Sequence, residues 1–184
     1  MNTVAVFLAD GFEEIEALTI VDLCRRAGLQ APTVSIMKEK TVKGSHNIPV
    51  AADMLLQDVD FEEVDMIMLP GGMPGTLNLE KCEPLMAQVK AFDKKGKYIS
   101  AICAAPTILA HLGILKGRNA CCYPSMEREL TDAKVSRNPV ECSDHITTSR
   151  GMGTAMELGL TIVERFLGKE TAGKLAETVV YRRA

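Results

Sequence analysis

The sequence predicts an α/β domain built on a doubly wound, mainly parallel sheet with helices on both faces. Apolar runs of strand length alternate along the chain with longer segments whose apolar residues recur at helical spacing. Strands that are apolar throughout are buried on both faces, as they are when helices cover the two sides of a sheet. The alternation of strands and helices favours βαβ units with right-handed crossovers.

The expected elements follow this pattern in chain order. Strands are predicted at residues 3–8, 33–37, 65–69 and 98–101, and helices at 13–27, 83–95 and 104–112. Residues 41–51 are predicted to form a hairpin, and 119–148 a less regular stretch with short strands near Val135 and Ile146, both as excursions from the sheet. A last long helix should begin after Gly153 and end at Gly168 in a left-handed cap, before a short final helix.

Length and composition limit the classes of function. The 184 residues, 47% of them hydrophobic, suit one core, so we expect residues 1–184 to form a single domain. The net charge of −3, with acids and bases interspersed, argues against nucleic acid or a membrane surface as a partner. No apolar run reaches transmembrane length and the first is too short for a signal peptide, so a cytoplasmic protein is expected.

The six cysteines include no C-x-x-C pair and are too sparse for a disulfide scaffold, so free thiols are expected. The adjacent Cys121 and Cys122 give only a weak hint of a metal site. Since no other cysteine or histidine stands at ligand spacing from them, no metal site is expected.

Cys103 is the candidate nucleophile. The β-prone run 98–102 gives way at Cys103 to small helix formers, with Pro106 in the first helical turn, where its missing N–H is tolerated. This pattern is typical of a nucleophile elbow, which exposes its side chain above the sheet. The N–H groups and dipole of the following helix predict a lowered pKa for the thiol and partial ionisation near neutral pH. The alternative is a buried cysteine that simply ends a strand.

A glycine-rich segment, residues 69–75, ends the preceding buried strand. Ligands of doubly wound sheets bind beyond the carboxyl ends of the strands, so this segment should lie beside Cys103. The backbone N–H of Gly72 is predicted to pair with that of Ala104 as an oxyanion hole. The alternative is a loop whose glycines only supply positive φ. The segment matches neither glycine motif for nucleotide phosphates, so no phosphate cradle is expected.

Glu16 is the candidate acid/base group. It lies on one helical stripe with the apolar Ile20 and Leu23, so burial should raise the pKa of its carboxyl. A protonated carboxyl can donate a hydrogen bond to a thiolate or move a proton for it. Ile15 and Leu18 lie on the nominally polar arc, which leaves this first helix apolar almost all round. We therefore expect it to lie in the interface of a homodimer, across a two-fold axis.

These segments, with residues 149–154 before the last long helix, resemble the ThiJ/PfpI superfamily, most closely the branch of the Parkinson-disease-linked protein deglycase. The resemblance covers essentially the whole chain through four motifs in order. It implies a flavodoxin-like fold and a homodimer. By resemblance, Cys103 is an oxidisable nucleophile and Glu16 its carboxyl partner, while Gly72 and Ala104 supply oxyanion-type amides.

Four further residues belong to the pocket that the resemblance implies. Arg26 and Arg150 match basic residues near the site of that branch. Tyr123 stands where the deglycase and many relatives place a histidine, so a Cys-His triad is unsupported and Tyr123 becomes a wall of the pocket. The late His-x-Glu pair of related glutamine amidotransferases is also missing, so neither a protease nor an amidase is expected. His46 replaces an arginine of the deglycase, which alters the local charge.

Two functions compete on this basis. A glyoxalase or deglycase without any cofactor would use Cys103 to attack methylglyoxal, or its early adduct on a glycated protein, with Glu16 moving the proton. An oxidative-stress sensor would instead have Cys103 oxidised to sulfenic or sulfinic acid. A chaperone that exposes an apolar patch is the third and weakest alternative.

Overall fold

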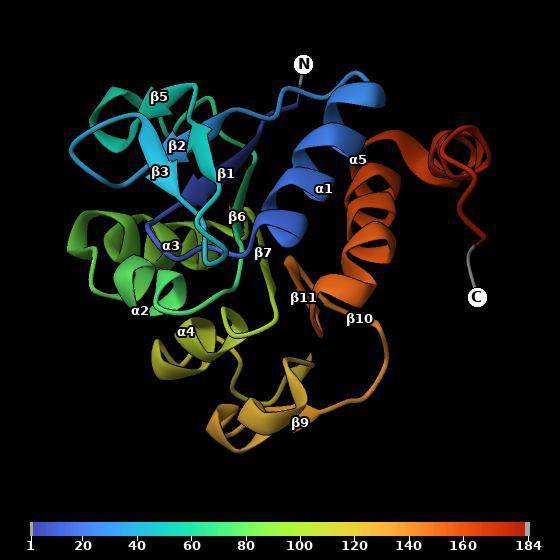
Figure 1. Cartoon of the computed structure of the whole chain (residues 1–184). Coiled ribbons are helices and arrows are strands. Elements are labelled where there is room, and N and C mark those ends of the chain that lie inside the picture. Colours follow the sequence, from blue (N-terminus) through green and yellow to red (C-terminus); the bar gives the residue numbers. More distant parts are fainter. Residues whose placement is uncertain (1, 183–184) are drawn as a thin grey trace.

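A seven-stranded sheet forms the centre of the computed structural model, which describes residues 2–182 (Figure 1). Its strands are β1 (Val4–Leu8), β2 (Thr33–Ser35), β5 (Met54–Leu55), β6 (Met66–Leu69), β7 (Tyr98–Ile102), β10 (Val140–Ser143) and β11 (Ile146–Ser149). They lie in the order β10–β11–β7–β6–β1–β2–β5, and only the β10–β11 pair is antiparallel. The five central strands have the flavodoxin-like order 2-1-3-4-5, which confirms the predicted fold class.

Helices cover both faces of the sheet. Their bounds are Glu14–Arg26 (α1), Gly75–Glu80 (α2), Glu83–Lys95 (α3), Pro106–His111 (α4) and Ala155–Thr178 (α5). α1 and α5 pack side by side on one face, and α2, α3 and α4 cover the other (Figure 1). Strand β1 serves both cores because its side chains alternate: Val4 and Val6 pack with α1 and α5, whereas Ala5 and Phe7 pack on the opposite face.

Two small excursions leave the sheet within the predicted regions 41–51 and 119–148. β3 (Thr41–Lys43) and β4 (Pro49–Ala51) form an antiparallel hairpin. β8 (Asn119–Ala120) and β9 (Lys134–Val135) form a short parallel pair. The strand predicted near Ile146 is not part of an excursion, because it is β11 and pairs with β7 in the central sheet. Three 3₁₀ turns complete the elements, with bounds Leu56–Asp58 (η1), Pro124–Glu129 (η2) and Met152–Thr154 (η3).

The helix after Cys103 begins later than predicted, whereas the predicted break at Gly168, with a further helix beyond it, is present. Ala104 and Ala105 belong to a turn, so the helix after Cys103 is α4, only six residues long. Gly168 interrupts α5 at φ 84° and ψ 164°, so it breaks the helix with positive φ but without the ψ of a left-handed cap. The helical hydrogen-bonding pattern resumes directly beyond it and reaches Thr178.

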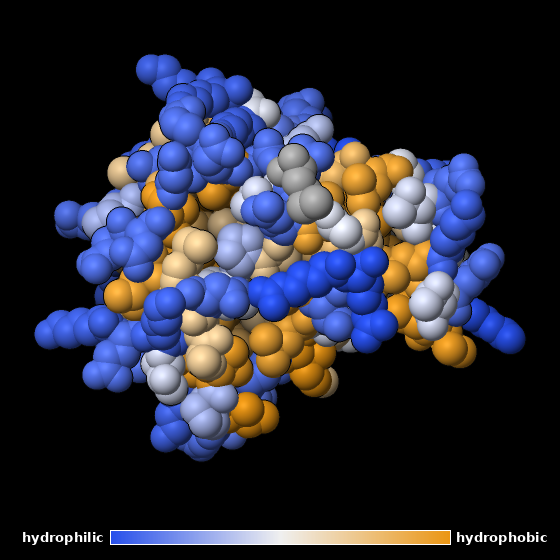
Figure 2. Space-filling model, turned by 90° about the horizontal axis from the view of Figure 1, so that it is seen from above, coloured by the Kyte–Doolittle hydropathy of each residue, from blue (hydrophilic) through white to orange (hydrophobic). Residues whose placement is uncertain are grey.

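Figure 2 shows the surface of the molecule from above the view of Figure 1. Many hydrophilic side chains lie on this face, together with smaller groups of hydrophobic ones. Its appearance agrees with the interspersed charges of the sequence. Within residues 2–182, none of the helices combines the length and the hydropathy that a bilayer span requires.

Candidate active site

Cys103 stands at a strained corner directly after β7. Its φ is 63°, a left-handed value that a residue with a side chain rarely adopts. The corner is held on both sides: the Cys103 N–H donates to the Ser149 carbonyl at 3.0 Å, and its own carbonyl accepts from the Tyr123 N–H at 2.8 Å. The half-buried thiol is therefore presented at the carboxyl edge of the sheet.

Glu16 reaches this corner from the first turn of α1. Its side chain is buried, with 1% of the residue exposed, among apolar neighbours such as Ile20 and Leu23. One carboxyl oxygen accepts from the Gly71 N–H at 2.9 Å, and the carboxyl also shares a hydrogen bond with the Cys103 sulfur. The nucleophile and the acid/base group predicted from the sequence are thus in direct contact.

The backbone amides of Gly72 and Ala104 both donate to the Cys103 sulfur. Gly72 reaches this position with φ 90°, and a Cβ there would lie 2.6 Å from the Gly11 carbonyl oxygen. Glycine is required at this position because both the conformation and the space exclude a side chain. The two amides face the sulfur itself, where they can stabilise negative charge.

Burial raises the pKa of Glu16 to about 7, and the nearby charge of Glu13 adds to the rise. Burial also raises the pKa of the Cys103 thiol, to about 12, with a further contribution from Glu16; the Ala104 and Gly72 amides oppose this rise and are outweighed. The elbow pattern predicted a lowered pKa for Cys103. That prediction was wrong because it did not take desolvation of the thiol into account. Because the two groups share a hydrogen bond, the pair releases one proton near neutral pH and retains the other.

Burial raises the pKa of three other thiols too, those of Cys24, Cys121 and Cys122. A shifted pKa alone therefore does not distinguish Cys103 from a structural cysteine. The combination of a carboxyl partner, two amide donors and a strained corner does so.

Gly71 is a site residue that the sequence did not single out. A Cβ at this position would lie 2.7 Å from the Cys103 Cβ, 2.7 Å from a Glu16 carboxyl oxygen and 3.0 Å from the Ile102 carbonyl. The missing side chain leaves room for Cys103 and Glu16 to meet. The only signal in the sequence is its place in the glycine-rich segment, which does not reveal which glycine faces the thiol.

The sequence profile of the DJ-1/PfpI family matches residues 2–165. The chain belongs to this family. It is 40% identical to DJ-1 homolog B of Arabidopsis thaliana over 97% of its length, and 37% identical to the glutathione-independent glyoxalase DJR-1.2 of Caenorhabditis elegans, covering 89% of this chain and 87% of that protein. It spans only 41% of homolog B and 47% of homolog A from the same plant.

Solved structures of DJ-1 proteins have the same fold. Oxidized Toxoplasma gondii DJ-1 superposes with a TM-score of 0.96 at 35% identity, and all of each chain is covered. Members of the DJ-1/PfpI family are thus similar to this chain over its whole length, and the agreement supports the flavodoxin-like architecture described above.

In this DJ-1/PfpI chain, Tyr123 and Arg150 lie beside the reactive corner. Tyr123 is half exposed. Its ring lies beside Gly151, 3.5 Å from the position that a Cβ at that glycine would occupy. Arg150 directly follows Ser149, whose carbonyl binds Cys103, and its guanidinium pairs with Glu127 at 3.6 Å. The backbone contacts of Cys103 therefore place both residues beside the reactive corner.

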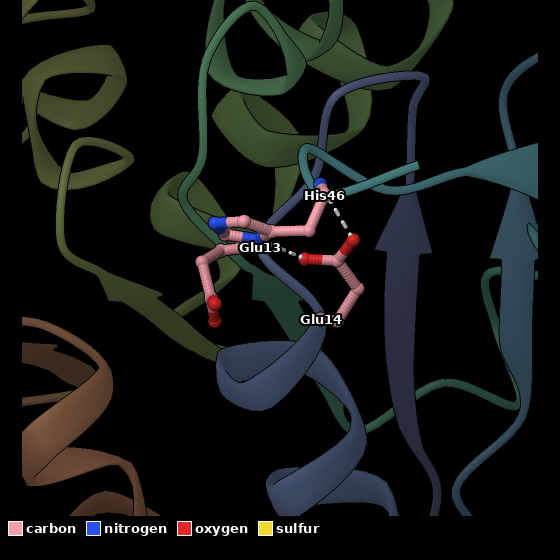
Figure 3. Close-up of side chains that lie close together, drawn as sticks. All are labelled: Glu13, Glu14 and His46. Carbon is pink, nitrogen blue, oxygen red and sulfur yellow. Dashed lines mark hydrogen bonds and ion pairs between the residues drawn. The ribbon is translucent and has the colours of Figure 1, made fainter. Parts of the chain in front are cut away.

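Arg26 and His46 lie elsewhere. Arg26 is ten residues beyond Glu16 on α1, which separates the two by about 15 Å along the helix axis, and it pairs with Asp22 at 2.6 Å. His46 lies near the tip of the β3–β4 hairpin and bonds to Glu14 (Figure 3). Within one chain the structure does not bring Arg26 to Cys103.

The two remaining histidines are paired with carboxylates other than Glu16. His111 pairs with Glu80 at 2.6 Å and His145 with Asp93 at 2.9 Å. For metal binding, one group within residues 2–182 has suitable spacing, namely Glu13, Glu14 and His46 (Figure 3). Its members come from segments some thirty residues apart, so no short sequence motif indicates the group.

Proposed function

We propose that the chain is a cofactor-independent glyoxalase or deglycase that acts through Cys103 on methylglyoxal or on its early adducts with proteins. The single observation that carries the proposal is the contact between the Glu16 carboxyl and the Cys103 sulfur, which also accepts two amide hydrogen bonds. This arrangement provides a nucleophile, a proton carrier and donors for developing charge. The printed name of the nematode relative, a glutathione-independent glyoxalase, supports the same chemistry.

The first step is addition to the aldehyde. Near neutral pH one proton is shared by the pair, and when Glu16 holds it the sulfur is a thiolate bound to the Gly72 and Ala104 amides. The thiolate attacks the aldehyde carbon of methylglyoxal, and Glu16 gives its proton to the aldehyde oxygen. The product is a hemithioacetal on Cys103, and Glu16 is left ionised.

The second step is an isomerisation of the adduct through an enediol. The Glu16 carboxylate removes the proton from the former aldehyde carbon and returns it to the neighbouring keto carbon, while the hydroxyl proton passes from the former aldehyde oxygen to the former keto oxygen. The hemithioacetal becomes a lactoyl thioester, so the aldehyde is oxidised and the ketone reduced within one molecule. Water then hydrolyses the thioester to lactate and restores the thiol, so no external oxidant or cofactor takes part.

Replacement of Cys103 by serine should reduce lactate formation from methylglyoxal to the rate of the buffer, because an alcohol is far less nucleophilic than a thiolate. The measurement is lactate release by purified wild type and Cys103→Ser, with Cys142→Ser as the control because that cysteine is also free but exposed. Equal rates in wild type and Cys103→Ser would refute the mechanism.

The second candidate function is oxidation sensing. Two amides and a carboxyl that can carry a proton would stabilise an oxygen added to the Cys103 sulfur. A peroxide would supply that oxygen: the thiolate attacks the O–O bond, and water and a sulfenate are formed. The oxidized form of the Toxoplasma gondii relative favours this candidate. The test is to treat the wild-type chain with mild peroxide and to assay it for lactate formation. Oxygen added at Cys103 without any lactate formation would favour oxidation sensing over glyoxalase activity.

We also propose a homodimer with α1 in its interface. Ile15 and Leu18 are neighbours on this helix and are exposed by 50% and 37% in the single chain. Exposed apolar side chains grouped on one helix are typical of an interface. A charge at Leu18 (Leu18→Glu) should therefore produce a monomer by light scattering, whereas Val135→Glu, at an equally exposed apolar position on β9, should not. A wild-type monomer would contradict the proposal.

A further inference from the structure

Two carboxylates and an imidazole converge at the amino end of α1. Glu13 caps the helix, Glu14 is its first residue, and His46 approaches from the β3–β4 hairpin. One ligand atom from each lies within 4.8 Å of the other two. Figure 3 shows the imidazole beside both acids, with Glu14 bonded to one ring nitrogen and the second ring nitrogen on the side of Glu13.

Glu14 is held in place for this arrangement. One of its carboxyl oxygens accepts from the His46 backbone N–H at 2.8 Å, and the other lies 2.8 Å from His46 Nδ1. A Cβ at Gly44 would displace the Glu14 carboxyl, so the glycine leaves this carboxyl free to reach His46. The hairpin and the start of the helix therefore hold Glu14 and His46 side by side.

Glu13 provides an independent indication of a cation. It is 9% exposed, and one of its oxygens accepts from the Glu16 N–H at 2.7 Å. No lysine, arginine or histidine among residues 2–182 comes within ion-pair distance of its carboxylate, and its second oxygen has no hydrogen-bond donor there. Within these residues, the second oxygen of Glu13 is therefore free to bind a cation beside Glu14 and His46.

We infer that Glu13, Glu14 and His46 form a binding site for one divalent transition-metal ion. The two carboxylates match a charge of two, and mixed oxygen and imidazole ligands suit zinc, cobalt or manganese better than calcium or magnesium. Such ions bind these ligands at about 2 Å, so the three groups must draw together. The exposed His46 side chain, on the hairpin, has the freedom to do so.

The proposed metal site is linked to Glu16 through the backbone of Gly71, but it does not include the reactive thiol. The Glu13 N–H donates to the Gly71 carbonyl at 2.9 Å, and the Gly71 N–H donates to Glu16. Neither Cys103 nor Glu16 belongs to the ligand group. Metal binding can therefore be measured in a chain that lacks the thiol, independently of any turnover.

The test is calorimetric titration of the full-length Cys103→Ser chain with Zn²⁺, because the native thiol could itself bind zinc. One zinc per chain is expected. His46→Gln and Glu13→Gln, each made in that background, should weaken binding by roughly tenfold or more. The matched control is His111→Gln, since His111 is another partly exposed histidine paired with carboxylates, and its removal should leave the affinity unchanged.

Paramagnetic Co²⁺ provides a second measurement that needs no ligand variant. Added to the Cys103→Ser chain, it should broaden the amide signals of residues 13–14 and 44–47 before any others. Broadening centred elsewhere, an absence of zinc binding to the Cys103→Ser chain, or an affinity that His46→Gln does not change would each overturn the inference.

Discussion

Replacement of Gly71 by alanine is expected to reduce the turnover of methylglyoxal by about a hundredfold or more. The added Cβ would lie 2.7 Å from both the Cys103 Cβ and a Glu16 carboxyl oxygen, so the two groups must move apart. Displacement of reacting groups by about 1 Å can reduce a rate by two orders of magnitude. The fold should survive, because overpacking at one position destabilises a protein by about 1–3 kcal/mol.

The measurement is kcat for lactate formation together with the free energy of unfolding of the same preparation. Gly153→Ala is the matched control: that glycine lies in η3, its φ is not positive, and a Cβ there meets no heavy atom within 4 Å. It should keep wild-type activity. If Gly71→Ala retained most of the wild-type kcat, the contact between Cys103 and Glu16 would not be needed for the reaction.

Glu16→Gln should abolish turnover and yet stabilise the fold at pH 8, by up to about 3 kcal/mol. The folded chain raises the pKa of Glu16 from 4.5 to about 7, so it binds that proton more tightly than the unfolded chain does. The stabilising contribution of the protonated carboxyl is complete below pH 4.5 and is lost as the pH rises through about 7. Glutamine stays neutral throughout, so the variant avoids this loss.

Urea unfolding of wild type and Glu16→Gln at several values between pH 4.5 and pH 8 tests this expectation. The difference between the two should be small at the acidic end and should grow with pH. Glu177→Gln, which removes an exposed carboxyl from α5, should show no such growth. A constant difference across this range would mean that Glu16 is not protonated by burial, and the shared-proton mechanism would fail with it.

The candidate site was predictable in part because some of its features are local. Cys103 ends an apolar strand and precedes Pro106, a pattern that places it at a corner wherever the strand lies in the sheet. Glu16 shares a helical stripe with Ile20, and both are buried in the structure. The resemblance to the ThiJ/PfpI superfamily implied that Glu16 is the partner of Cys103, and the rule that neighbouring strand ends share one edge placed the glycine-rich segment beside the thiol.

Other features of the site depend on segments that are distant in the sequence. The pKa of Cys103 is set by desolvation and by a carboxyl 87 positions away, so the elbow pattern predicted the wrong direction. His46 meets Glu14 only because the β3–β4 hairpin folds back onto α1. Arg26 was placed at the site by resemblance, and the length of α1 separates it from Glu16 within the chain.

The sequence by itself determined the doubly wound sheet, the corner at Cys103, the glycine-rich segment beside it and the buried stripe that carries Glu16. Hydrophobic periodicity and turn chemistry are properties of neighbouring residues, so they can be recognised in one dimension. Only the tertiary structure decided that Gly71 leaves room for the thiol and that the pair of Cys103 and Glu16 retains one proton at neutral pH. It also decided which acidic residues lie beside His46. Burial and charge act through space, and their effects on Gly71, Cys103 and His46 come from residues far away in the chain.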